Sequence, residues 1–170
     1  MLESERLLLK PLSFNELVSI NNDEIDDIEN RIELEAIYDF VKVAISKKIE
    51  KMQRVSEYIH VWYTYWLIIN KANGKGIGFI GFKGIPDEKG YIEVGYSISH
   101  NYRRKGFMTE ALFLLIDWAL KYPNCNGITA TKVLKTNVGS NEVLNNCNFI
   151  LVDSSNEFNN YMIKFNEQYM

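Results

Sequence analysis

The chain has 170 residues, of which 46% are hydrophobic and 24% charged, a composition typical of one soluble domain, residues 1–170, with enough apolar material to bury a core. Its formal net charge of −3 disfavours a nucleic-acid-binding protein, because such proteins normally carry a basic excess or a long basic face. The opening residues lack a secretory signal pattern, and no apolar run approaches the roughly 20 residues that span a bilayer, so we expect a cytoplasmic protein with no membrane partner.

The first third is predicted to hold a short strand followed by helices. Residues 6–11 read as a strand that ends at Pro11, and Ser13 is placed to cap a helix that begins near Phe14. Residues 23–56 are predicted to be helical, because five apolar residues fall roughly on one side: Ile28, Ile32, Ile37, Val41 and Ile45. The same segment carries an acidic block: Asp23, Glu24, Asp26, Asp27, Glu29, Glu33 and Glu35. Such a block is either a solvated helix face or a surface that attracts a cationic substrate.

From residue 61 the pattern changes to that of an antiparallel meander. Residues 61–69 are mostly aromatic and β-branched, which favours a strand, and the turn at 71–74 follows. Residues 76–85 are the next predicted strand. A turn at 86–90 leads to a strand at 91–99, in which apolar and polar residues alternate.

The rest of the chain returns to mixed helices and strands. A helix over 105–121 carries apolar residues on a wide arc, so we expect it to pack against the sheet. A strand at 127–134, a short helix at 140–147 and terminal strands at 149–152 and 158–165 follow. This order of elements predicts an α+β fold built around a mixed sheet.

A basic, glycine-containing turn stands between the strand at 91–99 and the helix that follows. Arg103, Arg104 and Lys105 supply three consecutive positive charges, and Gly106 allows the backbone to approach a ligand closely. The amino end of a helix presents unpaired N–H groups and a positive dipole, so an anion such as a phosphate is stabilised there. A solvated basic turn is the alternative, although cations at that end oppose the helix dipole.

Other candidate motifs fail on their context. Residues 76–81 match the pattern GxGxxG, but the strand continues after the last glycine, which disfavours a dinucleotide-binding site. Cys125 and Cys147 have neither CxxC spacing nor a nearby pair of histidines, so we expect reduced thiols and no metal site. His60 and His100 are expected to be packing or surface groups.

Two linked blocks resemble the GNAT acetyltransferase superfamily. The first runs from Glu93 to Leu112 and contains Glu-Val-Gly-Tyr-Ser-Ile-Ser-His-Asn-Tyr-Arg-Arg-Lys-Gly-Phe-Met-Thr-Glu-Ala-Leu, and the second runs from Thr136 to Phe149. The opening Ser4-Glu5-Arg6-Leu7-Leu8-Leu9-Lys10-Pro11-Leu12 makes the likeness strongest to the Rim-type ribosomal-protein N-terminal acetyltransferases. The resemblance implies a GNAT-like fold, with a central, mostly antiparallel mixed sheet of about seven strands and about four helices.

By this resemblance the chain binds acetyl-CoA. The superfamily signature R/Q-x-x-G-x-G/A maps onto Arg103, Gly106 and Met108, where Met108 replaces a small residue. In the second block Asn137 and Ser140 match, whereas Asn148 replaces a glycine. The implied cofactor-binding residues are Ser97, Ile98, Arg103, Arg104, Lys105, Gly106, Phe107, Met108, Thr109, Asn137 and Ser140.

The resemblance also implies catalytic roles for two residues. Glu93 lies on the strand face opposite Val94 and is the candidate general base, with a cross-strand or helix-pairing carboxylate as the alternative. Many relatives place a tyrosine, which protonates the departing thiolate, where this chain has Leu144. In the Rim-type branch a serine takes this role, which would fall on Ser140; that residue is equally suited to cap the helix.

We therefore expect an acetyl-CoA-dependent N-acetyltransferase in which a primary amine attacks the thioester directly. The acceptor would be a protein N-terminus or a small-molecule amine, and a homodimer is possible. The alternative is a catalytically silent domain that binds acyl-CoA as a sensor or interaction module, a reading motivated by Met108 and by the missing tyrosine.

Overall fold

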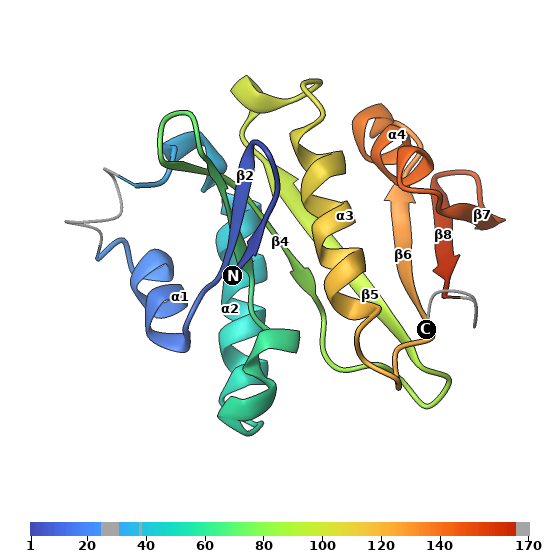
Figure 1. Cartoon of the computed structure of the whole chain (residues 1–170), viewed down its shortest axis with the longest axis horizontal. Coiled ribbons are helices and arrows are strands. Elements are labelled where there is room, and N and C mark those ends of the chain that lie inside the picture. The colour runs from blue at the N-terminus through green and yellow to red at the C-terminus, as the bar shows by residue number, and fades with distance from the viewer. Residues whose placement is uncertain (25–30, 38, 166–170) are drawn as a thin grey trace.

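Eight strands and four α-helices make up the described part of the chain, residues 1–24, 31–37 and 39–165, in a computed structural model (Figure 1). The strands are β1 (Leu2–Glu3), β2 (Leu7–Pro11), β3 (Trp66–Asn70), β4 (Lys75–Phe82), β5 (Tyr91–Ile98), β6 (Gly127–Leu134), β7 (Ile150–Ser154) and β8 (Phe158–Lys164). The α-helices are α1 (Phe14–Asn21), α2 (Asp39–Met52), α3 (Phe107–Ala119) and α4 (Val138–Asn146).

The strands form one sheet in the order β1-β2-β3-β4-β5-β6-β8-β7. Every neighbouring pair is antiparallel except β5 and β6, which run parallel. This confirms the predicted mixed, mostly antiparallel sheet and the α+β class. The sheet has one strand more than the sequence indicates, because Leu2 and Glu3 pair with β2.

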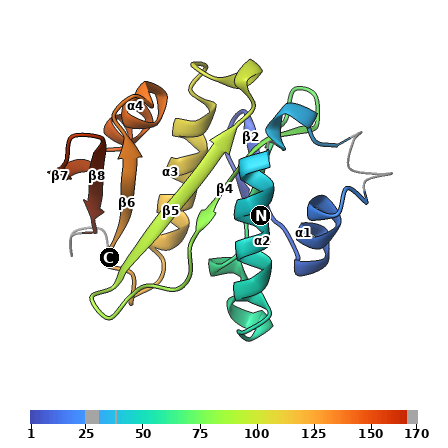
Figure 2. The same ribbon diagram turned by 180° about the vertical axis from the view of Figure 1, so that it is seen from behind.

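Helices cover both faces of this sheet. α3 crosses one face in Figure 1, and the reverse view in Figure 2 shows α1 and α2 on the other face. The apolar arc of α3 is buried as predicted, with Ala111, Leu112 and Leu115 fully enclosed. On the opposite face, Ile45 of α2 packs in a second core with Phe79 of β4. The two cores hold the sheet between its helices.

The amino end of α1 confirms the predicted cap. The Ser13 hydroxyl accepts a hydrogen bond from the backbone N–H of Glu16 at 3.2 Å, and a carboxylate oxygen of Glu16 accepts the backbone N–H of Ser13 at 2.8 Å. This reciprocal capping box satisfies two N–H groups that would otherwise lack partners. The helix begins where the sequence places it.

The predicted continuous helix over residues 23–56 is wrong. α2 begins only at Asp39 and ends at Met52, and a separate 3-10 turn occupies Leu34–Ala36. Just before that turn, Ile32 forms an isolated parallel bridge with Gly76 of β4. A contact with the sheet therefore overrides the helical pattern here. Four residues of the predicted apolar side and acidic block lie outside the described residues: Asp26, Asp27, Ile28 and Glu29.

The aromatic run that begins at residue 61 enters its strand later than predicted. Glu57–Trp62 is a 3-10 helix, and β3 starts at Trp66. The centre of the Trp62 ring lies 4.5 Å from the centre of the Trp118 ring in α3 and 4.8 Å from the centre of the Tyr122 ring. Side-chain packing against α3, rather than strand propensity, determines the backbone at Trp62.

Lys48 of α2 is a buried cation between α2 and the sheet. Its side chain donates from Nζ to the carbonyl oxygens of Phe82, at 2.7 Å, and Tyr63, at 3.0 Å. The ammonium lies 4.3 Å from the centre of the Tyr65 ring. Burial lowers the pKa of Lys48 to about 7, because a charged amine is costly in an apolar environment. Lys48 thus ties α2 to the sheet at an electrostatic cost.

We expect this lysine to make stability depend on pH. The pKa is about 7 in the folded protein and about 10.4 when unfolded, so between these values the unfolded state binds more protons and the free energy of unfolding rises with pH. Relative to Lys48→Met, the wild type should gain about 2 kcal/mol between pH 7 and pH 9. Urea unfolding of both proteins at three pH values measures the difference. Parallel curves would show that Lys48 does not change its protonation on unfolding.

Candidate active site

The parallel strands β5 and β6 pair over a short stretch and then diverge. On β5 the pairing with β6 runs from Tyr91 to Glu93, whereas β5 itself continues to Ile98. β6 is bulged where it pairs with β8, and Lys132 within the bulge has a φ of +53°. A bulge bends its strand and increases its twist. Figure 2 shows the ribbons of β5 and β6 separating toward the end of β5.

The amino end of α3 follows β5 after a connection, residues 99–106, that contains the 3-10 helix His100–Tyr102. Gly106 is the cap residue, in the left-handed conformation with a φ of +78°, and Arg104 before it also has a positive φ, +58°. The first backbone bond along the helix runs from the N–H of Glu110 to the carbonyl of Gly106, at 3.0 Å. The N–H groups of residues 107–109 precede it and have no intrahelical acceptor. The helix begins two residues later than predicted, which places Gly106 at the cap.

The three cations of the basic turn are exposed at this helix end. Arg103 donates from Nε to the carbonyl oxygen of Ile98 at 3.4 Å, and Lys105 donates from Nζ to that of Asn101 at 2.8 Å. Both contacts are to backbone carbonyls and leave the positive charges of the two side chains uncancelled. The turn therefore combines positive charge with free backbone donors, which is the arrangement that binds an anion.

The last residues of β5 line an open surface. Ser97 and Ile98 pair with β4 on one side, opposite Phe79 and Gly78. A Cβ atom added at Gly95 would meet a single neighbouring atom, Cε of Lys83 at 4.0 Å, so the space above this glycine is open. In the described sheet, the opposite edge of β5 has no strand partner beyond residue 93.

The glycines of residues 76–81 have a packing role. A Cβ atom at Gly78 would lie 2.4 Å from the carbonyl oxygen of Ser97, and one at Gly81 would lie 2.4 Å from that of Thr64. Both distances are too short for any side chain, so these glycines let neighbouring backbone segments approach β4. This confirms that the segment is a strand.

Glu93 lies where β5 and β6 begin to separate. Its carboxylate forms an ion pair with Lys83, and it accepts a hydrogen bond from the hydroxyl of Thr131 at 2.7 Å. The side chain is 28% exposed, so water and a small substrate can reach it. These two contacts are the cross-strand pairing that the sequence allows as the alternative to a role as general base. They also orient the Glu93 carboxylate beside the open surface over Gly95.

Ser140 is inside α4 rather than at its cap. α4 begins at Val138, and Asn137 is the cap residue, whose side-chain oxygen accepts the N–H of Ser140 at 3.1 Å. The predicted start at Ser140 and its capping role are therefore wrong, because a better acceptor stands three residues earlier. The Ser140 hydroxyl is left to bond elsewhere.

Because it contacts Ser140, Tyr96 of β5 is a candidate site residue, one that the sequence pattern does not reveal. Its hydroxyl accepts a hydrogen bond from the Ser140 hydroxyl at 3.0 Å and lies 3.4 Å from the Ser140 carbonyl, to which it donates. Burial raises the pKa of Tyr96 to about 12, so the phenol is protonated at neutral pH. Alternation along β5 assigns Tyr96 to the core face, and only the position of α4 brings it to Ser140.

Two carboxylates of the acidic block support the loop between β5 and α3. The hydroxyl of Tyr102 donates to Glu33 at 3.1 Å, and the side-chain amide of Asn101 donates to Glu35 at 2.5 Å. These two glutamates therefore do not form a solvated helix face. They fix the loop that leads to the basic turn from the α2 side of the sheet.

Residues 6–150 match the acetyltransferase (GNAT) domain. The chain belongs to the GNAT acetyltransferase family. The uncharacterized N-acetyltransferase YjdG of Bacillus subtilis is 39% identical over 97 residues, which cover 57% of this chain and 57% of that protein. The uncharacterized N-acetyltransferase p20 of Bacillus licheniformis is 40% identical over 82 residues, or 48% of this chain and 46% of that protein. The matched segment thus spans about half the length of these curated relatives.

Solved GNAT structures share the fold at low sequence identity. A ribosomal-protein-S5-alanine acetyltransferase from Vibrio fischeri has a TM-score of 0.67 and 19% identity. The match covers 99% of this chain and 97% of that chain. RimL, a ribosomal L7/L12 alpha-N-protein acetyltransferase, has a TM-score of 0.65 and 16% identity, with 95% and 94% covered. The microcin C7 self-immunity acetyltransferase MccE, solved with acetyl-CoA and AMP, has a TM-score of 0.64 and 18% identity, and the match covers 95% of this chain and 94% of that chain.

The departures of this chain from the GNAT signature are accommodated by its packing. Met108 is 6% exposed and belongs to the buried core, so its side chain points away from the surface of the turn. Leu144 is fully buried and leaves the tyrosine position of other relatives in the core. Asn148 has a φ of +63°, the left-handed conformation that asparagine tolerates after a helix.

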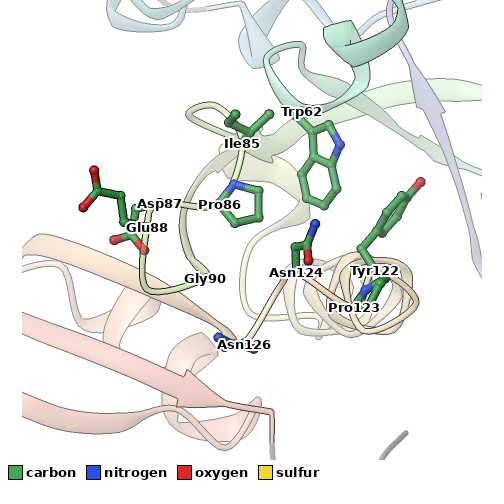
Figure 3. A pocket seen from close by; sticks show the side chains of 10 residues that line it. All are labelled: Trp62, Ile85, Pro86, Asp87, Glu88, Gly90, Tyr122, Pro123, Asn124 and Asn126. Atoms are coloured by element: carbon green, nitrogen blue, oxygen red, sulfur yellow. The ribbon is translucent and has the colours of Figure 1, made fainter.

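Two cavities differ in their relation to this GNAT site. One of about 420 Å³ adjoins the basic turn and is lined by Gly106 and Thr109, among others. The other, of about 590 Å³, lies beyond the opposite end of α3, between Pro86, Trp62 and Tyr122 (Figure 3). None of the residues predicted for the site lines the second cavity. Among the described residues, no cluster of three or more His, Cys, Asp or Glu is placed to hold a metal ion, and no helix has the length and apolar character to cross a membrane.

Proposed function

We propose that this protein is an acetyl-CoA-dependent N-acetyltransferase that transfers an acetyl group to a primary amine by direct attack. The observation that carries the proposal is the amino end of α3, where free N–H donors and three exposed cations stand beside the divergence of β5 and β6. A pyrophosphate suits the amino end of α3, because it carries negative charge and several hydrogen-bond acceptors. An extended chain with amide groups suits the space where β5 and β6 diverge.

The residues present fit coenzyme A along this path. The N–H groups of residues 107–109 and the side chains of Arg103, Arg104 and Lys105 would hold the pyrophosphate. The backbone of Ile98, on the edge of β5 that lacks a strand partner, would bond an amide of the pantetheine arm, whereas the Ser97 carbonyl faces Gly78 of β4, so that Ser97 would contribute through its side chain. Asn137 and Ser140 would close the site from α4.

The side chains around the divergence suit proton management during acyl transfer. Acetyl-CoA supplies an acetyl group activated as a thioester. An acceptor amine must lose a proton to react, and Glu93 would accept that proton directly or through a water molecule. The Tyr96 hydroxyl, oriented by Ser140, would donate a hydrogen bond to the negative charge that develops on the departing sulfur.

The acceptor class is part of the proposal. Structural relatives include acetyltransferases of ribosomal proteins and a spermidine N-acetyltransferase. For this chain we propose a protein N-terminus or a small-molecule amine. An α-amino group, with a pKa near 7.7 to 8.0, presents far more free base at pH 7 than a lysine side chain does.

The test is calorimetric titration with acetyl-CoA, followed by an acceptor panel. We expect saturable binding at micromolar concentrations, and acetylation of at least one peptide with N-terminal alanine or serine, or of spermidine. Absence of binding at millimolar acetyl-CoA would refute the proposal. Binding without release of free thiol over the whole panel would instead favour a catalytically silent acyl-CoA-binding domain.

Glu93→Gln is expected to lower turnover on the order of tenfold at pH 6.5 and to spare acetyl-CoA binding. The amide cannot accept a proton, and the loss should shrink as the pH rises because more amine is then already free base. The pH dependence of kcat for both proteins measures this difference. Glu157→Gln, an exposed change in the turn between β7 and β8, is the control. Superimposable pH profiles for wild type and Glu93→Gln would show that Glu93 serves as a pairing residue alone.

A further inference from the structure

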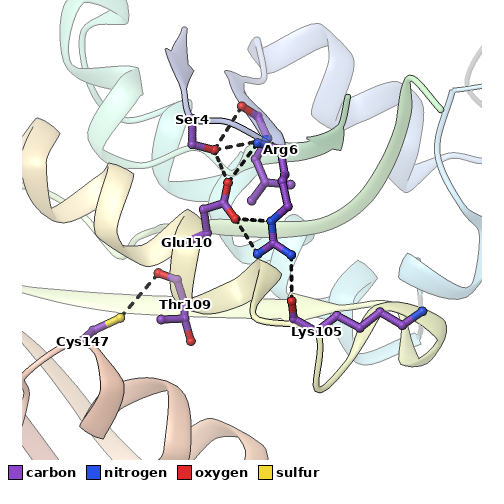
Figure 4. A network of polar contacts seen from close by, with 7 residues as sticks. Ser4, Arg6, Lys105, Thr109, Glu110 and Cys147 are labelled. Atoms are coloured by element: carbon purple, nitrogen blue, oxygen red, sulfur yellow. Dashed lines mark hydrogen bonds and ion pairs between the residues drawn. The ribbon is translucent and has the colours of Figure 1, made fainter. Parts of the chain in front are cut away.

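Glu110 in the first turn of α3 gathers the amino-terminal segment onto the helix. One carboxylate oxygen accepts hydrogen bonds from the Ser4 hydroxyl at 2.6 Å and from the Arg6 backbone N–H at 3.1 Å. The other oxygen receives the guanidinium of Arg6, with Nε at 2.7 Å and Nη2 at 2.6 Å (Figure 4). The carboxylate is therefore saturated by donors that lie more than 100 residues away in sequence.

Arg6 in turn touches three consecutive residues at the start of α3. Its Nη1 donates to the carbonyl oxygen of Lys105 at 2.9 Å. The guanidinium carbon lies 4.5 Å from the centre of the Phe107 ring. Between them, a Cβ atom at Gly106 would lie 3.4 Å from Arg6 Nη2. Arg6 thus supports the backbone that presents the free N–H groups to solvent.

The pair also settles the charge at this helix end. Burial acts to raise the pKa of Glu110, but hydrogen bonds from Ser4 and Arg6 outweigh it and lower that pKa, so the carboxylate is ionised at neutral pH. A carboxylate in the first turn stabilises the helix, yet it repels an anionic ligand bound there. The guanidinium cancels that repulsion while the helix keeps its amino-terminal carboxylate.

We propose that Arg6 and Glu110 are positioning residues for the cofactor: their ion pair holds the turn at residues 105–107 in the shape that binds pyrophosphate and neutralises the carboxylate beside it. This inference rests on the proposed acetyl-CoA activity. A residue with this role affects cofactor affinity and leaves the chemical step alone. A purely structural ion pair would change melting temperature and leave both parameters of the folded enzyme unchanged.

Three variants separate the two contributions of the pair. Arg6→Ala leaves the carboxylate uncompensated, and we expect it to raise the Kd for acetyl-CoA about tenfold to thirtyfold. Arg6→Lys keeps the charge without the planar fork and should recover part of the affinity. Arg6→Ala combined with Glu110→Gln should bind acetyl-CoA more tightly than Arg6→Ala, because the uncompensated negative charge is gone.

The experiment is calorimetry with acetyl-CoA at low and high salt, with steady-state kinetics on the same proteins. We expect the Arg6→Ala defect to fall on KM for acetyl-CoA, with kcat within about twofold, and to shrink at high salt. Arg54→Ala, which removes an exposed ion pair with Glu50 on α2, is the control and should leave KM unchanged.

The outcomes distinguish this inference from the proposed function. If the wild type binds acetyl-CoA and Arg6→Ala binds it equally well, the positioning role is overturned and the proposed function stands. If the wild type does not bind, the proposed function fails first. Should Arg6→Ala not fold, Arg6→Lys decides: a wild-type Kd and KM would overturn the inference, and a KM above that of the wild type, with the ratio of the two smaller at high salt, would support it.

Discussion

Gly106→Val is expected to raise the Kd for acetyl-CoA at least about 100-fold and to leave a folded protein. Gly106 caps α3 with a φ of +78°, a conformation that a β-branched residue adopts only under strain. The added side chain would also stand among the N–H groups of residues 107–109 and against Arg6 Nη2. Losing two charge-assisted hydrogen bonds, at roughly 1.5 kcal/mol each, accounts for a change of this size.

A matched control separates backbone strain from loss of the anion site. Gly74, in the turn between β3 and β4, has a φ of +71°, and a Cβ atom there would meet nothing within 4 Å. Gly74→Val therefore carries a similar strain without obstructing the turn at α3. We expect calorimetry to show wild-type affinity for Gly74→Val. If Gly106→Val also binds as the wild type does, the amino end of α3 is not the pyrophosphate site.

Local patterns in the sequence were sufficient where local chemistry determines the structure. Alternation along residues 91–99 defines β5, and the apolar arc of residues 107–119 defines the buried face of α3. The capping pair Ser13 and Glu16 sets the start of α1. Each of these features depends on neighbours within a few positions, and the sequence displays those directly.

The failures occur where contacts distant in sequence override local preference. Residues near Ile32 have helical spacing, but a bridge to Gly76 draws them onto the sheet. Trp62 is of a residue type that favours strands, but its packing on Trp118 places it in a 3-10 helix. No periodicity in the sequence records such contacts, because they depend on how the elements meet.

The candidate site shows the same division. The basic turn at residues 103–106 can be predicted from the sequence, because its positive charges, its glycine and the start of the helix are adjacent in the chain. The pair formed by Arg6 and Glu110 is hidden by a separation of 104 residues. Tyr96 is hidden for another reason: alternation places it correctly on the core face, and it gives no information on which helix covers that face.

The hydroxyl pair of Tyr96 and Ser140 leads to the second large effect that we expect. Tyr96→Phe and Ser140→Ala should each lower kcat about 100-fold, which is the usual consequence of removing a hydrogen-bond donor to a developing negative charge. Ser140 donates to Tyr96 at 3.0 Å, whereas the proton of Tyr96 engages a carbonyl at the long distance of 3.4 Å and is available to a ligand. Because the two hydroxyls act as a unit, the double variant should lose little more than either single variant.

The raised pKa of Tyr96 decides how this hydroxyl can act. A phenol with a pKa of about 12 does not transfer its proton fully to a thiolate, whose conjugate acid has a pKa near 8.5. It stabilises the sulfur by hydrogen bonding. After Glu93 has taken the first proton of the acceptor, the second proton, which the nitrogen loses as the amide forms, converts the thiolate to the thiol. We therefore expect no change in the shape of the pH–rate profile of Tyr96→Phe below pH 9, only a uniform loss. Tyr161→Phe is the control, since Tyr161 is a buried tyrosine that donates to Asn141 of the same helix at 2.7 Å. Equal kcat values for the two phenylalanine variants would show that the Tyr96 hydroxyl holds α4 in place and does not assist the reaction.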